Sequence, residues 1–242
     1  MTEITAQFNQ SDILASFENV TKTYGRKVAL DNVSFVLRKA KIIGLLGPNG
    51  SGKTTAIKLL NGLIQPNSGK IEIDGEAPGV HSKSIISYLP DKNYLNDWMS
   101  INKLLDFFST FYEDFDVERA RVMLKNLDLN PEDSLKTLSK GNKEKVQLIL
   151  AMSRRAKLYI LDEPIGGVDP AARDYILSTI IGNYSNEASI LISTHLISDV
   201  EKVLDDVIII NNGSIYIQDS VDNIRIEQGK SVDELFREVF RC

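Results

Sequence analysis

The stretch GPNGSGKTT, residues 47–55, constrains this chain more than any other segment. It matches the pattern G-x-x-x-x-G-K-[ST], follows the apolar run KIIGLL and precedes AIKLLNGLI, which has helical periodicity. A glycine-rich turn without a ligand is the alternative, but this strand–loop–helix context favours a loop whose backbone N–H groups surround phosphate oxygens. Lys53 would reach the outer phosphates, and Thr54 would bind Mg²⁺. The predicted loop residues are Asn49, Gly50, Ser51, Gly52, Lys53, Thr54 and Thr55.

Short apolar runs alternate with helical patterns along the chain. The richest runs are IIGLL, LYIL, SILIS and VIII, which start at residues 42, 158, 189 and 207. Continuous apolar strands of this kind suit a parallel sheet that is covered on both faces. A long helical pattern separates two of these strands, so we predict an α/β fold with an inserted helical subdomain at about residues 92–156. The expected boundaries are a flexible tail at 1–12 and a single domain at 13–242.

An acidic pair ends the segment KLYILDEP, residues 157–164. Asp162 and Glu163 follow an apolar strand, at the edge where an open parallel sheet binds ligands. A lone pair of this kind more often caps the next segment. Downstream of a phosphate loop, it instead predicts Mg²⁺ held by Asp162 through water, and a water molecule polarised by Glu163 for attack on the γ-phosphate. Guanine specificity is not expected, because the nearest match to N-K-x-D is NKEK, with Lys145 replacing the aspartate.

Charge and composition restrict the partners. The 33 acidic and 28 basic residues give a formal net charge of −5, which provides no general attraction to nucleic acid. No apolar run approaches the roughly 20 residues that span a bilayer. The single cysteine, Cys242, leaves no internal disulfide framework. The sequence therefore predicts a soluble protein of a reducing compartment.

Further motifs accompany the phosphate loop and the acidic strand. They are TKTYG at 21–25, LSKG at 138–141, GGVDP at 166–170 and STH at 193–195. In this order and spacing the chain resembles the ATP-binding cassette (ABC) ATPases, from about Ile13 to its end. The resemblance implies a P-loop NTPase fold of the ABC type. Its mainly parallel core sheet would carry an N-terminal antiparallel β-subdomain and the inserted helical subdomain.

The resemblance also implies roles for individual residues. Tyr24 would stack on adenine, although a strand-end tyrosine without a ligand is the alternative. His195 would hold the γ-phosphate and help to position the attacking water. Ser139 and Gly141 would contact the γ-phosphate bound to the other subunit, and Asp169 would link the two sites across the interface. Two chains, identical or different, would thus enclose two ATP molecules.

Two positions depart from the family pattern. The family usually has glutamine, an Mg²⁺ and water contact, after the strand that resembles ISYLP. Here the residue is Asp91, whose carboxylate is still a suitable metal ligand. The common LSGGQ becomes LSKGN, with Lys140 in place of the first glycine. Lysines in the first turn of the following helix oppose its dipole by about 0.3 kcal/mol or more each, a penalty that a neighbouring triphosphate would offset.

The predicted function is ATP hydrolysis that powers a separate membrane-spanning transporter. The chain would lie at the cytoplasmic face of the cell membrane, held there by that partner. The LSKGN form and Asp91 resemble the small ATPases of Gram-positive exporters of peptides or antibiotics, so export is the expected direction. An importer ATPase is the alternative within the same class. A cassette protein that acts on ribosomes or DNA is the alternative from another class.

The segment between Tyr94 and Phe115 is rich in aromatic residues. At helical spacing, most of them are expected in the core of the helical subdomain. Those nearest Asp91 are candidates for a groove that binds a helix of a membrane protein, at the place where transport subunits dock in the family. These candidates are Tyr94, Leu95, Trp98 and Met99.

Overall fold

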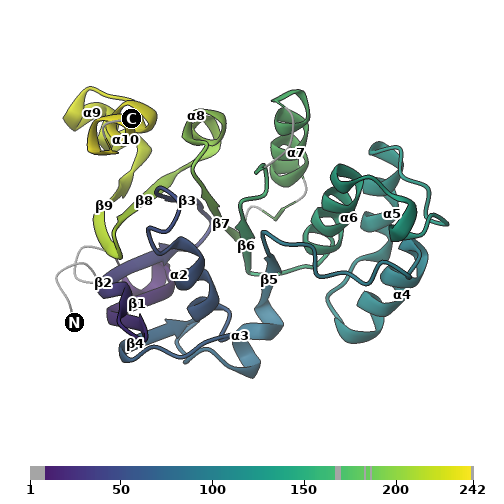
Figure 1. Ribbon diagram of the computed structural model, residues 1–242, viewed down its shortest axis with the longest axis horizontal. Coiled ribbons are helices and arrows are strands. Elements are labelled where there is room, and N and C mark those ends of the chain that lie inside the picture. Colours follow the sequence, from purple (N-terminus) through teal and green to yellow (C-terminus); the bar gives the residue numbers. More distant parts are fainter. Residues whose placement is uncertain (1–8, 167–169, 183, 186, 241–242) are drawn as a thin grey trace.

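A computed structural model describes residues 9–166, 170–182, 184–185 and 187–240, and it contains two β-sheets (Figure 1). The core sheet has the strand order β5-β6-β7-β3-β8-β9. Its strands are β3 (Ile42–Leu46), β5 (Ile86–Leu89), β6 (Leu158–Asp162), β7 (Ser189–Thr194), β8 (Asp206–Asn211) and β9 (Ser214–Ser220). Neighbouring strands run parallel, apart from the antiparallel pair β8 and β9. The prediction of a mainly parallel core sheet in an α/β fold is confirmed.

The smaller sheet is antiparallel and has the order β2-β1-β4. Its strands are β1 (Ile13–Tyr24), β2 (Lys27–Arg38) and β4 (Ser68–Ile73), and a short 3₁₀ helix, η1 (Gln10–Asp12), precedes them. The ends of β1 and β2 at the hairpin turn stay paired with each other, although most of their side chains there are only partly buried or are exposed. This sheet is the expected antiparallel β-subdomain.

The inserted helices lie between β5 and β6. They are α4 (Ile101–Phe111), α5 (Val117–Asn126), the short 3₁₀ helix η2 (Leu135–Thr137) and α6 (Lys140–Met152). Figure 1 shows α4, α5 and α6 together at one end of the molecule, away from the small sheet. This arrangement confirms an inserted helical subdomain, whose bounds at about 92–156 stay a prediction.

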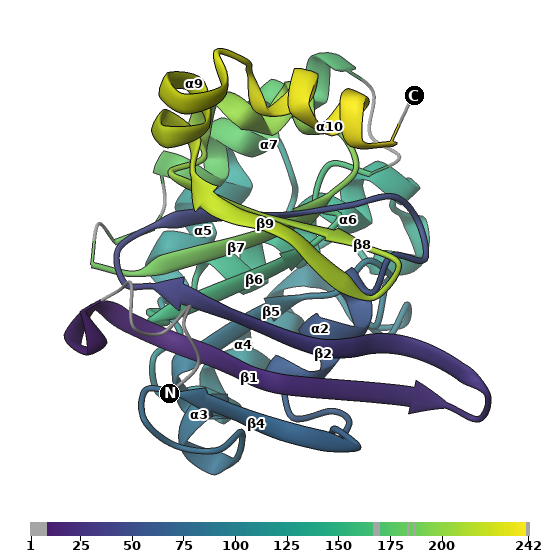
Figure 2. The same cartoon turned by 90° about the vertical axis from the view of Figure 1, so that its left-hand side faces the viewer.

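The remaining helices flank the core sheet. They are α2 (Lys53–Leu60), α3 (Val80–Ile85), α7 (Pro170–Gly182), α8 (Ile197–Val200), the 3₁₀ helix η3 (Glu201–Val203), α9 (Val221–Gln228) and α10 (Val232–Phe240). Figure 2 shows β1, β2 and β4 on one side of the core sheet, with α9 and α10 on the other. No helix of the described ranges is both long and apolar enough to cross a membrane.

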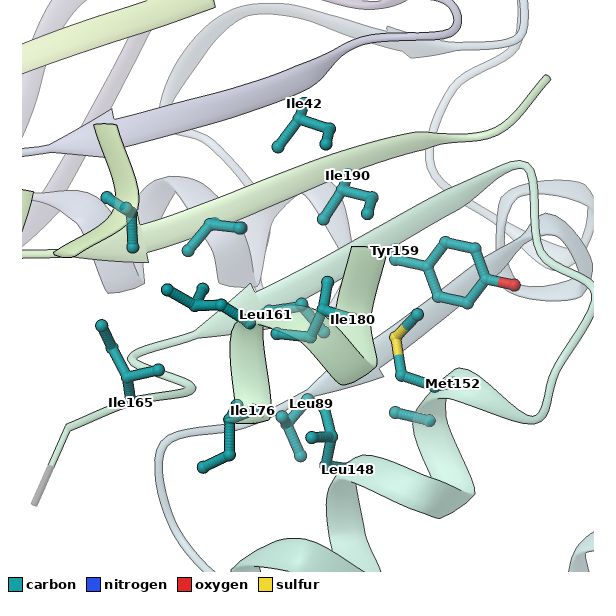
Figure 3. Packing of buried hydrophobic residues seen from close by; sticks show 14 of the residues in the cluster. Ile42, Leu89, Leu148, Met152, Tyr159, Leu161, Ile165, Ile176, Ile180 and Ile190 are labelled. Atoms are coloured by element: carbon teal, nitrogen blue, oxygen red, sulfur yellow. The ribbon is translucent and has the colours of Figure 1, made fainter. Parts of the chain in front are cut away.

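The core sheet separates two hydrophobic clusters, and β6 contributes to both. Leu158 and Ile160 pack with α2 and the small sheet, whereas Tyr159 and Leu161 pack with the inserted and C-terminal helices (Figure 3). Successive side chains of a strand point to opposite faces, so an apolar strand serves both clusters. Burying each such side chain stabilises the fold by about 1.5–3 kcal/mol. Because both faces of the core sheet are covered, the backbone that a ligand can reach lies at the ends of its strands.

Four loops meet at one edge of the core sheet. The parallel strands β5, β6, β7 and β3 are neighbours in that order, so their carboxyl ends lie side by side. The loop of residues 47–52 follows β3, and Asp91, Glu163 and His195 follow β5, β6 and β7. Segments that are far apart in the sequence therefore reach the same place, as a parallel sheet requires.

Candidate functional site

A cavity of about 530 Å³ opens at this edge of the core sheet, and we call it the nucleotide cleft. Its lining residues are Tyr24, Lys27, Ala29, Asn49, Gly50, Gly52, Lys53, Thr54, Thr55, Asp91, Lys140, Glu163, Gly166 and His195. The structure thus brings together most of the residues predicted to serve the chain's own nucleotide. Ser51 and Asp162, which were also predicted, are buried and do not belong to the lining.

The phosphate loop needs glycine at two positions where it approaches other backbone. A Cβ atom on Gly47 would lie 2.4 Å from the carbonyl oxygen of Ile210, and one on Gly52 would lie 2.7 Å from that of Ala29. Gly52 also has φ of +120°, a conformation that residues with a side chain rarely adopt. Helix α2 then begins without a side-chain cap. Its first N–H groups are therefore not occupied by a capping side chain and can donate to an anion.

Lys53 is the first residue of α2 and is only 6% exposed. Its Nζ donates to the carbonyl oxygens of Gly47 at 2.7 Å and Pro48 at 3.3 Å, and it lies 3.5 Å from Oε1 of Glu163. Burial lowers the pKa of the Lys53 ammonium, and the Glu163 carboxylate opposes this shift. A confined ammonium of this kind gains from a further anion, such as a phosphate oxygen.

The Glu163 backbone has φ of +52°, which is uncommon for a residue other than glycine. Its N–H donates to the carbonyl oxygen of Ser193 at 3.0 Å and to the Ser193 hydroxyl at 3.2 Å, and the Gly166 N–H donates to the Glu163 carbonyl at 2.9 Å. These bonds fix the turn after β6. The carboxylate then contacts Lys53 through Oε1, while Oε2 lies 3.1 Å from Nδ1 of His195. A base, a cation and an imidazole therefore meet in one cleft.

Asp162 supplies a buried carboxylate behind this turn. The Ser193 hydroxyl donates to its Oδ1, whereas its Oδ2 has no hydrogen-bond partner among the described residues. Burial raises the pKa of Asp162, the Ser193 hydrogen bond opposes this, and the nearby Asp91 carboxylate adds to it. An unpaired buried carboxylate oxygen suits a cation. Mg²⁺ typically takes one or two carboxylates and completes its shell with phosphates and water.

The described residues contain no group of three or more His, Cys, Asp or Glu side chains that would hold a metal alone. The metal roles predicted for Asp91, Asp162 and Thr54 stay predictions; their oxygen donors are of the kind that Mg²⁺ takes together with nucleotide phosphates and water. Thr54 is exposed at the start of α2 and lines the cleft with Asp91.

The tip of the small sheet forms the outer wall of the cleft. Tyr24, at the end of β1, is about half exposed, and Lys27 pairs with it across a two-residue turn. Lys27 and Ala29 were not predicted as site residues. A recognisable signal for Lys27 was available, because a Gly-Arg turn between two strands places its two flanking residues side by side.

The start of α6 has a side-chain cap. Ser139 is the N-cap, and its hydroxyl accepts from the N–H of Asn142 at 3.2 Å. Ser139 and Gly141 are exposed and do not line the cleft, whereas Lys140 between them does. Asp169 lies outside the described residues. The roles of Ser139, Gly141 and Asp169 toward a second subunit therefore stay predictions.

A second cavity, of about 410 Å³, lies between the core sheet and the helical subdomain, and we call it the aromatic groove. Its lining residues are Asn61, Leu63, Lys83, Ile86, Ser87, Tyr88, Pro90, Tyr94, Phe108, Tyr112, Ala151 and Arg154. Of the four residues predicted here, Tyr94 lines the groove. Trp98 is 71% exposed outside it, while Leu95 and Met99 pack against the hydrophobic core.

Residues 30–166 match the family model described as ABC transporter. The chain belongs to the ABC transporter family. Membership identifies it as an ATP-binding subunit of a transporter. The matched range runs from β2 to the turn after Glu163, so it contains the phosphate loop, the acidic pair and the helical subdomain.

Several relatives and solved structures cover almost the whole chain. The ABC-type transporter ATP-binding protein EcsA of Bacillus subtilis is 32% identical over 93% of this chain and 96% of its own length. The SkfA peptide export ATP-binding protein SkfE of the same organism is 31% identical over 94% and 96%. A solved ATP-binding subunit of an ABC transporter has a TM-score of 0.84 at 29% identity, covering 94% of this chain and 99% of its own. These matches confirm the ABC-type P-loop NTPase fold.

Proposed function

We propose that this ABC ATPase hydrolyses Mg-ATP to ADP and phosphate and thereby powers the export of a peptide or an antibiotic by a separate membrane-spanning subunit. The observation that carries the hydrolytic part is the contact of one carboxylate, that of Glu163, with both Lys53 and His195 in the nucleotide cleft. The export direction is supported by the similarity to SkfE, which is named for peptide export.

The chemistry assigned to the cleft uses the chain's own groups. The N–H groups of the loop and the Lys53 ammonium bind the phosphates, and the Tyr24 ring stacks on adenine. Glu163 accepts a proton from the attacking water, and His195 holds the γ-phosphate beside it. Thr54, Asp91 and Asp162 hold Mg²⁺, which, when bound, neutralises phosphate charge.

ABC ATPase subunits work in pairs, and the proposed pair, of identical or different chains, shares its sites. Ser139 and Gly141 contact the γ-phosphate of the nucleotide on the other subunit, and Asp169 links the two sites. The exposure of Ser139 and Gly141 supports this assignment, as does the open space around Gly141, where an added Cβ would meet no atom within 4 Å. A surface that is left open in one chain is available to a second.

The aromatic groove is the proposed docking site for a helix of the membrane-spanning subunit, which holds the protein peripherally at the cytoplasmic face of the membrane. Tyr88, Tyr94 and Tyr112 offer aromatic surface with polar tips, and Lys83 adds a cation at the rim. These groups fit an amphipathic helix that carries an acidic residue beside its apolar face. Leu63, more than half exposed, extends the apolar surface.

Two measurements test the proposal. The purified protein should release phosphate from Mg-ATP, and a protein without turnover, alone or with its membrane partner, would not be the proposed enzyme. Tagged protein extracted from cells should fractionate with membranes and retain a membrane-spanning subunit after detergent extraction. Sedimentation with ribosomes in place of membranes would exclude transport.

A further inference from the structure

Lys140 belongs to the helical subdomain and yet lines the nucleotide cleft of its own chain. It is the first residue of α6, and its side chain is 83% exposed. Its ammonium lies 3.7 Å from Oε1 of Glu144, one helical turn further on. This separation exceeds that of a charge-assisted hydrogen bond, so the pair is a weak competitor for the ammonium. A more highly charged anion in the cleft would displace Glu144.

The neighbouring Lys143 has a different environment. It lies in the same turn of α6, but its Nζ is 2.9 Å from Oδ1 of Asp97 and its side chain is only 19% exposed. It is absent from the lining of the cleft. Of these two lysines in the segment LSKGNKEK, Lys140 alone presents its charge to the cleft, which makes Lys143 a matched control.

The charges of the cleft favour a role for Lys140. Lys53 already has Glu163 as a partner, and Asp91 adds a second carboxylate to the lining, so a polyphosphate would meet two negative charges. Lys27 and Lys140 are the exposed lysines among the lining residues. A lysine at the first position of a helix opposes the helix dipole unless an anion is near. Where LSGGQ has a glycine without a side chain, this chain thus places a cation.

We infer that Lys140 binds the polyphosphate of the nucleotide in its own chain's cleft, before two subunits close. This inference rests on the proposed function. It concerns the chain's own nucleotide, whereas Ser139 and Gly141 are proposed to contact the nucleotide on the other subunit. One turn of α6 then serves two nucleotides in succession. In the open monomer Lys140 holds the chain's own nucleotide, and in the closed pair Ser139 reaches the partner's. When the two subunits close, Lys140 has to move away from the nucleotide of its own chain.

The test measures nucleotide binding to the monomer. Isothermal titration with Mg-ADP and with a magnesium complex of a non-hydrolysable ATP analogue is carried out at a protein concentration that sedimentation shows to be monomeric. Lys140→Met should weaken binding about two- to fivefold, the size expected for an exposed ion pair. It should also reduce the salt dependence of binding. Lys143→Met should bind like the wild type, and Lys140→Arg should retain most of the affinity.

Three outcomes would overturn the inference. Equal affinity of wild type and Lys140→Met would show that the ammonium makes no contact. A loss that occurs only at concentrations where the dimer forms would assign Lys140 to the partner's nucleotide. An equal loss in Lys140→Arg would show that charge is not the cause. Failure of the wild type to bind any magnesium nucleotide would instead contradict the proposed function.

Discussion

Two helices of this protein begin with a lysine next to the nucleotide cleft, and their first turns are built in opposite ways. Helix α2 starts at Lys53 without a side-chain cap, and its lysine is buried against backbone carbonyls. Helix α6 starts at Lys140 behind the capping hydroxyl of Ser139, and its lysine extends into solvent. The start of α2 thus leaves its first N–H groups open to an anion, whereas the start of α6 already has a side-chain cap.

The difference extends to unpaired polar atoms. Among the described residues, three buried side-chain oxygens have no hydrogen-bond partner: Ser51 Oγ and Asp162 Oδ2, which lie near the start of α2, and Asn102 Oδ1 in α4. Leaving such groups unpaired costs about 1–3 kcal/mol each, which a bound ligand would offset. At the α6 end, Ser139 is bonded to Asn142 and Lys143 to Asp97. The α2 end therefore leaves buried oxygens without a partner, whereas the hydrogen-bonding groups at the start of α6 named above are paired within the chain.

The largest effect should come from Glu163→Gln. This variant separates ATP hydrolysis, which uses the residues around the start of α2, from ATP-driven dimerisation, which uses the start of α6. The substitution removes the base and keeps the side-chain size, so turnover should fall by about 10²- to 10⁴-fold while ATP still binds. A phosphate-release assay measures the loss, and gel filtration with ATP should show a stable dimer. A variant that remains monomeric with ATP would contradict the shared sites.

Lys53→Met should remove the buried positive charge with which the start of α2 binds phosphate. Methionine fills the space but carries no charge, so turnover should fall about 10²- to 10³-fold and nucleotide affinity should fall far more than in Lys140→Met. Thermal unfolding without nucleotide serves as the control for an intact fold. If Lys53→Met kept turnover within tenfold of the wild type, the buried Lys53 would not contribute more to the reaction than the exposed Lys140, contrary to what their burial indicates.

Asp162→Asn tests how much the buried Asp162 carboxylate, with its unpaired Oδ2, lowers the free energy of unfolding. Burial raises the folded-state pKa of Asp162, so the wild type loses stability as pH rises from the ordinary carboxyl value through the raised one. In the presence of a chelator, the variant should be more stable at neutral pH by about 1–2 kcal/mol, and the gap should close in acid. Urea unfolding at several pH values measures this. Parallel pH profiles for the two proteins would argue against an ionised, unpaired carboxylate.

Ser139→Ala should have the smallest effect. Loss of the N-cap should cost about 1 kcal/mol of unfolding free energy. In a Glu163→Gln background it should weaken ATP-driven dimerisation, measured by sedimentation, more than it weakens ATP binding to the monomer. Asn142→Ala, which keeps both the capping hydroxyl of Ser139 and the backbone N–H that donates to it, is a suitable control. Equal losses of dimer and monomer binding in Ser139→Ala would place Ser139 at its own nucleotide.

The α2 end could be predicted from the sequence because all its signals are local. A strand, a glycine-rich loop and a helix follow one another, and Asp162 and Glu163 end an apolar strand, so the parallel sheet alone brings them together. The position of Lys140 depends on how the helical subdomain packs against the core sheet, and no local pattern encodes that packing. The same limit explains the aromatic groove, where helical spacing does not distinguish Tyr94 from the exposed Trp98.

The close approach of two glycines has a mechanical consequence. Gly47 rests on the backbone of Ile210 in β8, and Gly52 rests on that of Ala29 in β2. The phosphate loop therefore packs against both the core sheet and the small sheet and connects them. A nucleotide that makes this loop more rigid should cause the two sheets to unfold as one cooperative unit. Amide hydrogen exchange should then slow in β2 and β8 together, although the phosphate loop belongs to neither strand.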